Sequence, residues 1–373
     1  MRFFIIIIAL LQAFSLGAVL SLQWWLQPWL TPSIALAVWA IVFSITNGLL
    51  LLSFSKLLTN SYRWMSAWML VMHFMMLTAL VTSLCYGGYL LLVSLTTTAI
   101  YSPEIVDLGL RILAGLVFIA MFIYSLYCAY VPVVRRLSIT INKPLSSSLR
   151  IAMVSDLHLG ELFGNKAIGK LHHLLEANKA DMLLMPGDIM DDNIKAYTAH
   201  NMASRLKELC NSLPYGVYAT LGNHDLYGHE QSISNALRSA GVQLLNDEVL
   251  SLDYKGQPIW LVGRFDNHKH QRVETTDLLA KVNSAEPVIL LDHRPSDIDD
   301  HSQLPIDLQV SGHTHDGQVF PANFIVRAIN PLGYGYKAIG KGHFVVSSGY
   351  GFWGIPFRLG SRAEIWLIDV VGR

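Results

Sequence analysis

The sequence predicts an α/β domain with a largely parallel central sheet, preceded by a transmembrane region of about four helices. Two observations support this fold class. The first third is apolar and nearly free of charge, and the remainder alternates short apolar strands with helical stretches. The chain holds 27 basic and 27 acidic residues, but residues 1–131 contain only six of them. We therefore predict a transmembrane region at 1–131, a linker at 132–148 and a second domain at 149–373.

Four apolar runs lie in the first region, and each is long enough to cross a hydrocarbon core about 30 Å thick. A backbone in lipid must satisfy its own hydrogen bonds, so each run is expected to be a helix. The first run could instead be a signal peptide, but its length, its single basic residue and its lack of a clean cleavage site favour a retained helix. The runs cover residues 3–22, 33–54, 66–95 and 105–131.

The basic residues of this region predict its orientation. They precede the first run, separate the second from the third and follow the fourth, at Arg2, Lys56, Arg63, Arg135, Arg136, Lys143 and Arg150. The loops at 23–32 and 96–104 contain neither Lys nor Arg. Because positive charge stays on the cytoplasmic side, we expect the N-terminus and the large domain to be cytoplasmic. Arg111 is the one discordant charge, and its side chain is expected to snorkel toward the interface.

The second domain alternates strands and helices in the order expected for an α/β fold. The predicted strands are 150–155, 182–185, 217–221, 258–263, 287–291, 306–310, 343–347 and 363–370. The predicted helices are 166–178, 196–211 and 231–240. This alternation predicts parallel central strands whose carboxyl ends meet at one edge.

Charge and cysteine content limit the partners. The first 131 residues hold four basic and two acidic side chains, so the rest of the chain carries 23 basic and 25 acidic ones. No strong basic field is available for a nucleic-acid backbone, and no specific nucleic-acid partner is expected. The chain has three cysteines, which do not indicate a disulfide framework.

Polar side chains fall directly after five of the predicted strands. The five segments are Asp156-Leu157-His158, Gly187-Asp188, Gly222-Asn223-His224-Asp225, Asp292-His293 and Gly312-His313-Thr314-His315. In α/β sheets, ligand sites form outside the carboxyl ends of the strands. We therefore expect these side chains to converge on one site.

Carboxylate, imidazole and amide oxygen are ligands for Mn, Fe and Zn ions. Asp156 and His158 stand two residues apart at a strand end, so both can face the same ion. His313 and His315 can serve neighbouring ions, and the two oxygens of Asp188 can bridge the pair. Two ions roughly 3.5–4 Å apart can clamp the attacking and leaving oxygens of a phosphoryl transfer. The pattern thus predicts a two-metal hydrolytic site.

In this order, D-x-H, G-D, G-N-H-D, a lone H and G-H-x-H resemble the calcineurin-like metallophosphoesterases over about residues 149–370. The segments GHTHDGQVFP and SSGYGFWGIPFR resemble a branch that includes bacterial membrane-associated phosphoesterases, although that branch usually has Gly at the position of Asp316. The resemblance implies an αββα sandwich. It also implies hydrolysis of phosphomonoester, phosphodiester or pyrophosphate bonds by hydroxide activated by two divalent metal ions, with Mn, Fe or Zn as the expected metals.

The resemblance also implies residue roles. One ion would be held by Asp156, His158, Asp188 and His315, and the second by Asp188, Asn223, His293 and His313, with Asp188 bridging. His224 would contact the phosphate and protonate the leaving group, and Asp225 would orient His224. A single His after a strand is common, and His293 is assigned as a ligand by its place between the G-N-H-D and G-H-x-H motifs. Arg264 is interpreted either as a phosphate contact or as a surface residue, and Asp191 and Asp192 as a helix N-cap.

These patterns predict an integral membrane protein of the bacterial inner membrane, with a cytoplasmic metal-dependent phosphoesterase domain. Anchoring favours a phospholipid, a nucleotide-linked lipid or an isoprenoid pyrophosphate as substrate hypotheses. The alternatives are a non-catalytic binding or scaffold module on the same fold, and a membrane sensor with a phosphoesterase output. The bond type, the metal identity and the oligomeric state stay open.

Overall fold

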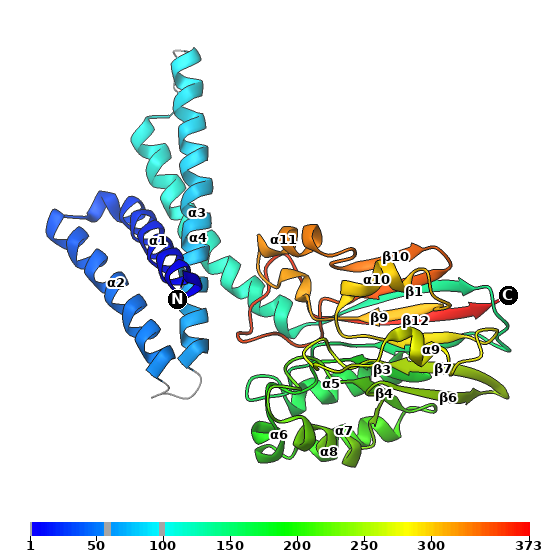
Figure 1. Cartoon of the computed structure of the whole chain (residues 1–373). Coiled ribbons are helices and arrows are strands. Elements are labelled where there is room, and N and C mark those ends of the chain that lie inside the picture. The colour runs from blue at the N-terminus through cyan, green and yellow to red at the C-terminus, as the bar shows by residue number, and fades with distance from the viewer. Residues whose placement is uncertain (1, 56–60, 97–100) are drawn as a thin grey trace. The chain divides into compact units, whose positions relative to one another are not determined.

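A computed structural model of the chain describes residues 2–55, 61–96 and 101–373. It contains two compact units, a helical unit that extends to Tyr124 and a second unit from Ser125 to Arg373. Figure 1 shows the order of their helices and strands. The positions of the two units relative to each other are not determined, so each unit is described by itself.

The helical unit consists of long apolar helices. They are α1 (Arg2–Leu26), α2 (Pro32–Ser55), α3 (Ser61–Thr96) and α4 (Pro103–Tyr130), with a short 3-10 helix η1 (Gln27–Trp29) after α1. Within the described residues, three stretches are long and apolar enough to cross a membrane, namely 32–53, 62–96 and 103–130. The prediction that α1 is a fourth span stays a prediction. Lys56 and residues 97–100, on which the predicted orientation partly rests, lie outside the described residues.

Arg111 differs from its predicted role. Its side chain is buried and forms an ion pair of 2.7 Å with Asp107, one helical turn earlier on α4. The guanidinium also lies over the ring of Trp24, 4.6 Å from the ring centroid. An acidic neighbour and an aromatic face compensate the charge in place, so the side chain has no need to reach an interface.

The second unit is built on two mixed six-stranded sheets. The first sheet has the strand order β1 (Val133–Ile141), β12 (Glu364–Gly372), β2 (Leu149–Met153), β3 (Met182–Pro186), β4 (Val217–Thr220) and β5 (Gln243–Leu244). The second has the order β10 (Gly335–Ile339), β11 (Gly342–Val346), β9 (Leu308–Ser311), β8 (Val288–Leu291), β7 (Gln257–Gly263) and β6 (Glu248–Tyr254). β2 to β5 are parallel to one another, as are β7, β8, β9 and β11, whereas β12 runs antiparallel to β2.

Strand alternation separates the two faces of the first sheet. Ile151 and Met153 of β2 lie in a core shared with the second sheet, and Ala152 between them faces the helices. The outer helices of the first sheet are α5 (Asn165–Ala177), α6 (Lys195–Ala199), α7 (Met202–Asn211) and α8 (Glu230–Ser239). The second half of the unit adds α9 (Thr275–Leu279), η2 (Pro295–Asp297), α10 (Ile298–His301), η3 (His315–Gly317) and α11 (Ala322–Ile329). The predicted α/β sandwich is therefore confirmed.

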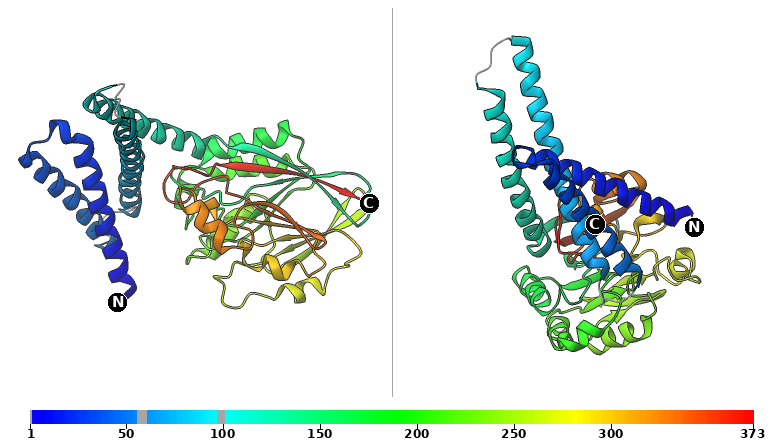
Figure 2. Two further views of the ribbon diagram at one scale, coloured as in Figure 1. Left: turned by 90° about the horizontal axis from the view of Figure 1, so that it is seen from above. Right: turned by 90° about the vertical axis from the view of Figure 1, so that its left-hand side faces the viewer.

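The predicted linker at 132–148 is wrong in its first part. Residues 133–141 form β1, which pairs in parallel with β12 from Val133 opposite Glu364 to Ile141 opposite Gly372. The two strands run side by side at the edge of the first sheet (Figures 1 and 2). Ile139 and Ile141 point into the core between the sheets. The charged pair Arg135-Arg136 interrupts the apolar pattern by which a strand is predicted from sequence. In addition, the strand that pairs with β1 comes from the other end of the chain.

Some other elements also differ from prediction. Strands β5, β6 and β10 and the helices α9 and α11 were not predicted. The helix expected over 196–211 is divided into α6 and α7, and Asn201 between them has a left-handed backbone with φ 47°. A break of this kind is typical of an Asn, whose side chain tolerates that conformation.

We expect a fragment beginning at residue 145 to be less stable than one beginning at Ser125. The shorter fragment lacks β1, so it exposes the backbone edge of β12 and uncovers the core next to Ile139 and Ile141. Thermal unfolding and light scattering of the two purified fragments would measure the difference. Equal melting temperatures and equal solubility would contradict this role for β1.

Candidate metal centre

Five strand ends bring the predicted site residues together, as the sequence indicated. β2, β3 and β4 of the first sheet and β8 and β9 of the second lead into the loops that carry them. Five of these residues have left-handed backbones, with φ between 46° and 70°, and they are Asp156, His158, Asp188, His313 and His315. Non-glycine residues seldom adopt this conformation, at a cost of about 1–3 kcal/mol each, and such residues concentrate at functional sites.

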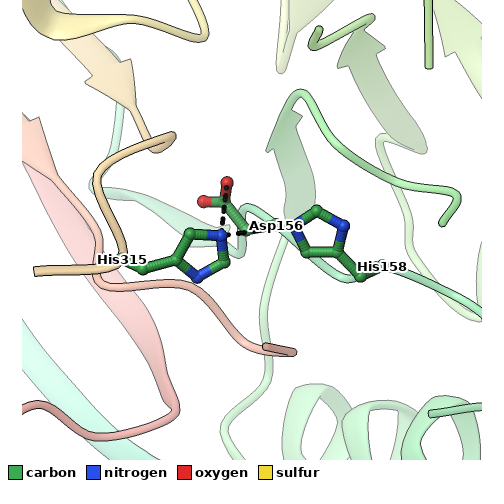
Figure 3. A group of neighbouring side chains, drawn as sticks. All are labelled: Asp156, His158 and His315. Carbon is green, nitrogen blue, oxygen red and sulfur yellow. Dashed lines mark hydrogen bonds and ion pairs between the residues drawn. The ribbon is translucent and has the colours of Figure 1, made fainter. Parts of the chain in front are cut away.

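Asp156, His158 and His315 form the first group of donor atoms (Figure 3). The two Nε2 atoms of His158 and His315 are 3.2 Å apart, and Nε2 of His315 lies 3.5 Å from Oδ1 of Asp156. Burial lowers the pKa of His158 to about 4 and that of His315 well below its usual value. Both imidazoles are therefore neutral, and each can offer a lone pair.

Asp188, His293 and His313 form the second group. Nε2 of His293 lies 3.2 Å from Oδ2 of Asp188, and Nδ1 of His293 donates to the carbonyl oxygen of Pro186 at 2.9 Å. That hydrogen bond fixes the tautomer and directs Nε2 into the site. Burial opposes charge on His293, but Asp188 outweighs it and raises the pKa of His293 to about 10. Cation binding here must therefore displace a proton.

Asp188 lies between the two groups. Its Oδ2 is 3.2 Å from His293 and 3.8 Å from Nε2 of His158, and its Oδ1 accepts the backbone N–H of His224 at 2.9 Å. Burial would raise the pKa of Asp188, but the charge and hydrogen bond of His293 hold it below its usual value. One ionised carboxylate thus borders both donor groups, as a bridging ligand would.

Asn223 adds an amide oxygen. Its Nδ2 donates to the hydroxyl of Tyr227 at 2.8 Å, so the amide orientation is fixed. Its Oδ1 is buried and accepts no hydrogen bond from the residues that the structure describes. A buried acceptor of this kind is costly without a donor or a cation. Carboxylate, imidazole and amide oxygen together fit divalent ions such as Mn, Fe and Zn.

Three glycines make this convergence possible. A Cβ atom on Gly187 would collide with the ring of His293, one on Gly222 with Asp188, and one on Gly312 with Asp156. The glycines that precede Asp188, Asn223 and His313 are therefore required by close packing of the loops.

Comparison with known proteins decides the family. The family model described as calcineurin-like phosphoesterase matches residues 149–317. An Aquifex aeolicus (strain VF5) protein named "Uncharacterized metallophosphoesterase" is 30% identical over 239 residues, which cover 62% of this chain and 88% of that protein. The chain belongs to the calcineurin-like phosphoesterase family. The resemblance inferred from the motifs is thereby confirmed.

Two further relatives of this calcineurin-like phosphoesterase are a second bacterial protein and a protein whose name describes it as transmembrane. A Helicobacter pylori (strain J99) protein, also named "Uncharacterized metallophosphoesterase", is 32% identical, covering 63% of this chain and 62% of that protein. A Bos taurus protein named "Transmembrane protein with metallophosphoesterase domain" is 33% identical, covering 64% of this chain and 57% of that protein. The matched region thus spans less than two thirds of these two relatives.

The predicted partner of His224 in this phosphoesterase is wrong. Nδ1 of His224 lies 2.6 Å from Oδ1 of Asp192, not from Asp225. Asp192 is not a helix N-cap either, because α6 begins later and Asn193 accepts the backbone N–H of Lys195. Asp192 belongs to no recognisable motif, and only the path of the loop after β3 brings it to His224. The sequence therefore did not indicate this contact.

Asp225 instead holds two loops of the site together. Its carboxylate is fully buried and accepts the backbone N–H groups of Ile189, Met190 and Gly222 at 2.9–3.1 Å. These donors belong to the loops that follow β3 and β4. Burial and the charge of Asp188 raise the pKa of Asp225 to about 7. Its role is to position Asp188 and Asn223.

Arg264 neither reaches the site nor lies on the surface. It is buried and contacts Asp292 and Asp297 at 3.3 and 3.1 Å. Arg272 contacts the same two carboxylates. Asp292, Asp297 and His301 form a third cluster of donor atoms, but here guanidinium groups compensate the charge. This cluster is a structural ion network, and no metal role follows for it.

Arg358 was given no role by the sequence. It is fully buried, and its Nη2 donates to the carbonyl oxygens of Ser348 and Gly351 at 2.7 Å while lying 3.2 Å from Nδ1 of His315. Burial lowers the pKa of Arg358 to about 10, which leaves it charged at neutral pH. The loop that supports His315 is thus built around a buried cation.

We expect Asp225→Ala to destabilise the phosphoesterase unit by about 3 kcal/mol or more, because three buried N–H groups lose their acceptor at about 1–3 kcal/mol each. Asp225→Asn keeps an acceptor oxygen and should lose less. Denaturant unfolding of both variants would measure the free energies. An Asp225→Ala protein of full stability that only loses activity would restore the predicted catalytic role.

Proposed function

We propose that the protein is a membrane-anchored, metal-dependent phosphoesterase that hydrolyses phosphomonoester, phosphodiester or pyrophosphate bonds. The observation that carries this proposal is the pair of buried donor groups that share Asp188, in a chain of a phosphoric ester hydrolase family. A scaffold on this fold would not need the full set of donors. The complete set therefore favours catalysis.

The donor residues can be divided between two metal ions. Asp156, His158 and His315 would hold the first ion, and His293 and His313, with the free amide oxygen of Asn223, the second. Asp188 borders both groups and would serve both ions. A bound pair of divalent ions supplies an acidified water and neutralises charge on the phosphoryl group. The donor set suits Mn, Fe or Zn.

His224 is suited to give a proton to the leaving oxygen. Its ring lies 4.9 Å from the ring of His158, at the border of the first donor group. Burial disfavours the charged ring, but the hydrogen bond to Asp192 and the charges of Asp188 and Asp192 raise the pKa of His224 above its usual value. Asp192 on Nδ1 leaves the Nε2 proton for transfer, so Asp192 is the positioning residue.

Membrane anchoring is supported by the three long apolar helices and by the transmembrane name of a relative. The distribution of basic residues supports a cytoplasmic catalytic unit at the bacterial inner membrane. A lipid-linked phosphoester is the substrate hypothesis that follows. A soluble substrate cleaved as well without membranes as any lipid would count against it.

We expect Asp188→Asn to reduce hydrolysis of bis-p-nitrophenyl phosphate by at least about a hundredfold, because one neutral amide replaces the charge shared by both ion sites. The assay uses the full chain in detergent with added Mn²⁺, beside a Glu208→Gln control on the exposed face of α7. Metal analysis of both proteins would show reduced metal content only in Asp188→Asn. Equal activity of parent and variant would refute the proposed two-metal chemistry.

We expect Asp192→Asn to slow esters with poor leaving groups much more than p-nitrophenyl esters. A weakly basic p-nitrophenolate departs without a proton, whereas phenolate or alkoxide needs one, and general acid catalysis contributes about a hundredfold or more. Rates for phenyl and p-nitrophenyl phosphates, taken with His224→Gln as a reference, measure the difference. The same fractional loss on both esters would mean that Asp192 does not act through proton transfer.

A further inference from the structure

Helix α11 has its apolar side chains on the solvent side. The polar residue Asn323 is buried, with 8% of its surface exposed. The apolar residues Phe324, Ile325 and Ile329 are instead 62%, 59% and 72% exposed. A surface helix of a soluble domain normally buries its apolar stripe against the core. The helix therefore presents an apolar face, defined here as the α11 surface (Phe324, Ile325 and Ile329), that the second unit itself does not cover.

This exposure is concentrated. Together with Trp353, which is 54% exposed, the three residues are the most exposed large apolar side chains between Ser125 and Arg373. Single exposed apolar side chains are common on protein surfaces, but a cluster of them marks a surface that binds another protein or a membrane. Trp353 lies toward the catalytic groups, with its ring 6.5 Å from that of His224.

The α11 surface is joined rigidly to the metal centre. Asp316 follows His315 directly, and its two carboxylate oxygens accept from Nε and Nη2 of Arg327 on α11, both at 2.8 Å. A Cβ atom on Gly317 would collide with the backbone of Ala322 and Asn323, so the first turn of α11 rests on the ligand loop. The Asp316 that departs from the related branch thus serves to fix α11.

The turn that leads into α11 lies close to the last turns of α4, which belong to this unit. The backbone N–H of Phe320 bonds Leu359, and the N–H of Leu359 bonds Gln318, so the turn before α11 lies along the segment 358–363. The same segment holds the last turn of α4, through Arg358 N–H to Ser125 and Ala363 N–H to Cys128. Residues 103–130 of α4 are a candidate membrane span.

We propose that the α11 surface is a membrane-contact surface, on which Phe324, Ile325 and Ile329 enter the interfacial region of the bilayer. Short helices with an apolar face lie in this region, and Trp favours the same depth. The end of α4 that belongs to this unit closes a candidate membrane span and shares the segment 358–363 with the turn before α11, which favours the bilayer over a protein as the occupant. If the proposed function holds, the metal centre then lies near the lipid surface, because its ligand loop is joined to α11, and this fits a phosphoester carried by an amphiphile.

The test measures the depth of α11 in lipid. The full chain carries Cys85→Ser, since Cys128 and Cys210 are buried, and a nitrobenzoxadiazole label at Ile329→Cys. The labelled protein is reconstituted at one copy per nanodisc, and the nanodisc lipid is an equal mixture of phosphatidylcholine and phosphatidylglycerol. We expect blue-shifted emission that is quenched by phosphatidylcholine with a spin label near the headgroup. The matched label at Ser204→Cys, on the exposed face of α7, should stay unshifted and unquenched.

A second variant guards against misfolding. Phe324→Ser, Ile325→Ser and Ile329→Ser together, with the label moved to Ala328→Cys, should abolish quenching while hydrolysis of bis-p-nitrophenyl phosphate continues. A label at 329 that is not quenched in the parent overturns the proposal, and so does a label that is shielded but inaccessible to lipid quencher, which indicates a protein partner. Absence of ester hydrolysis in the parent would refute the proposed function alone, because quenching does not depend on catalysis.

Discussion

The carboxylate of Asp188 is the constraint on which the site depends. It stands at the end of β3 in the first sheet and touches His293 from the second sheet, His158 from the loop after β2 and the backbone of His224. A buried carboxylate needs this much compensation, since an isolated charge cannot be buried. The contact of Asp188 with His293 thus joins the two sheets at the edge where the donor atoms meet.

Compensated burial of charge recurs around this centre. Asp225 joins the loops after β3 and β4 through three backbone donors, and Arg358 supports the loop behind His315. Asp316 and Arg327 extend the same principle to α11. Each of these sets of contacts fixes a loop that has little regular structure of its own, and so helps to hold the donor atoms in place. Preorganisation of this kind is what electrostatic catalysis requires.

Much of the fold and of the site could be predicted because both depend on local patterns. Strand β3 is a short apolar run, and the G-D motif Gly187-Asp188 directly follows it. The position of Asp188 at a strand end could therefore be predicted. The failures have a common cause. β1 required its partner β12 from the opposite end of the chain, and Asp192 required a loop path that no spacing encodes. Asp225 lay in the right motif, but the direction of its side chain depended on which backbone donors lacked an acceptor.

The sequence by itself determined the family, the α/β class, the seven candidate ligands and the apolar character of the first region. The family and the set of ligands follow from the motifs and the resemblance that they carry. The α/β class and the apolar character follow from residue identity and from periods of two or 3.6 residues, which are local properties. Only the tertiary structure decided which carboxylate serves His224, which arginines are buried, and that α11 turns its apolar face outward. Side-chain direction and burial depend on neighbours brought together across the whole chain, and for that reason no local pattern contains them.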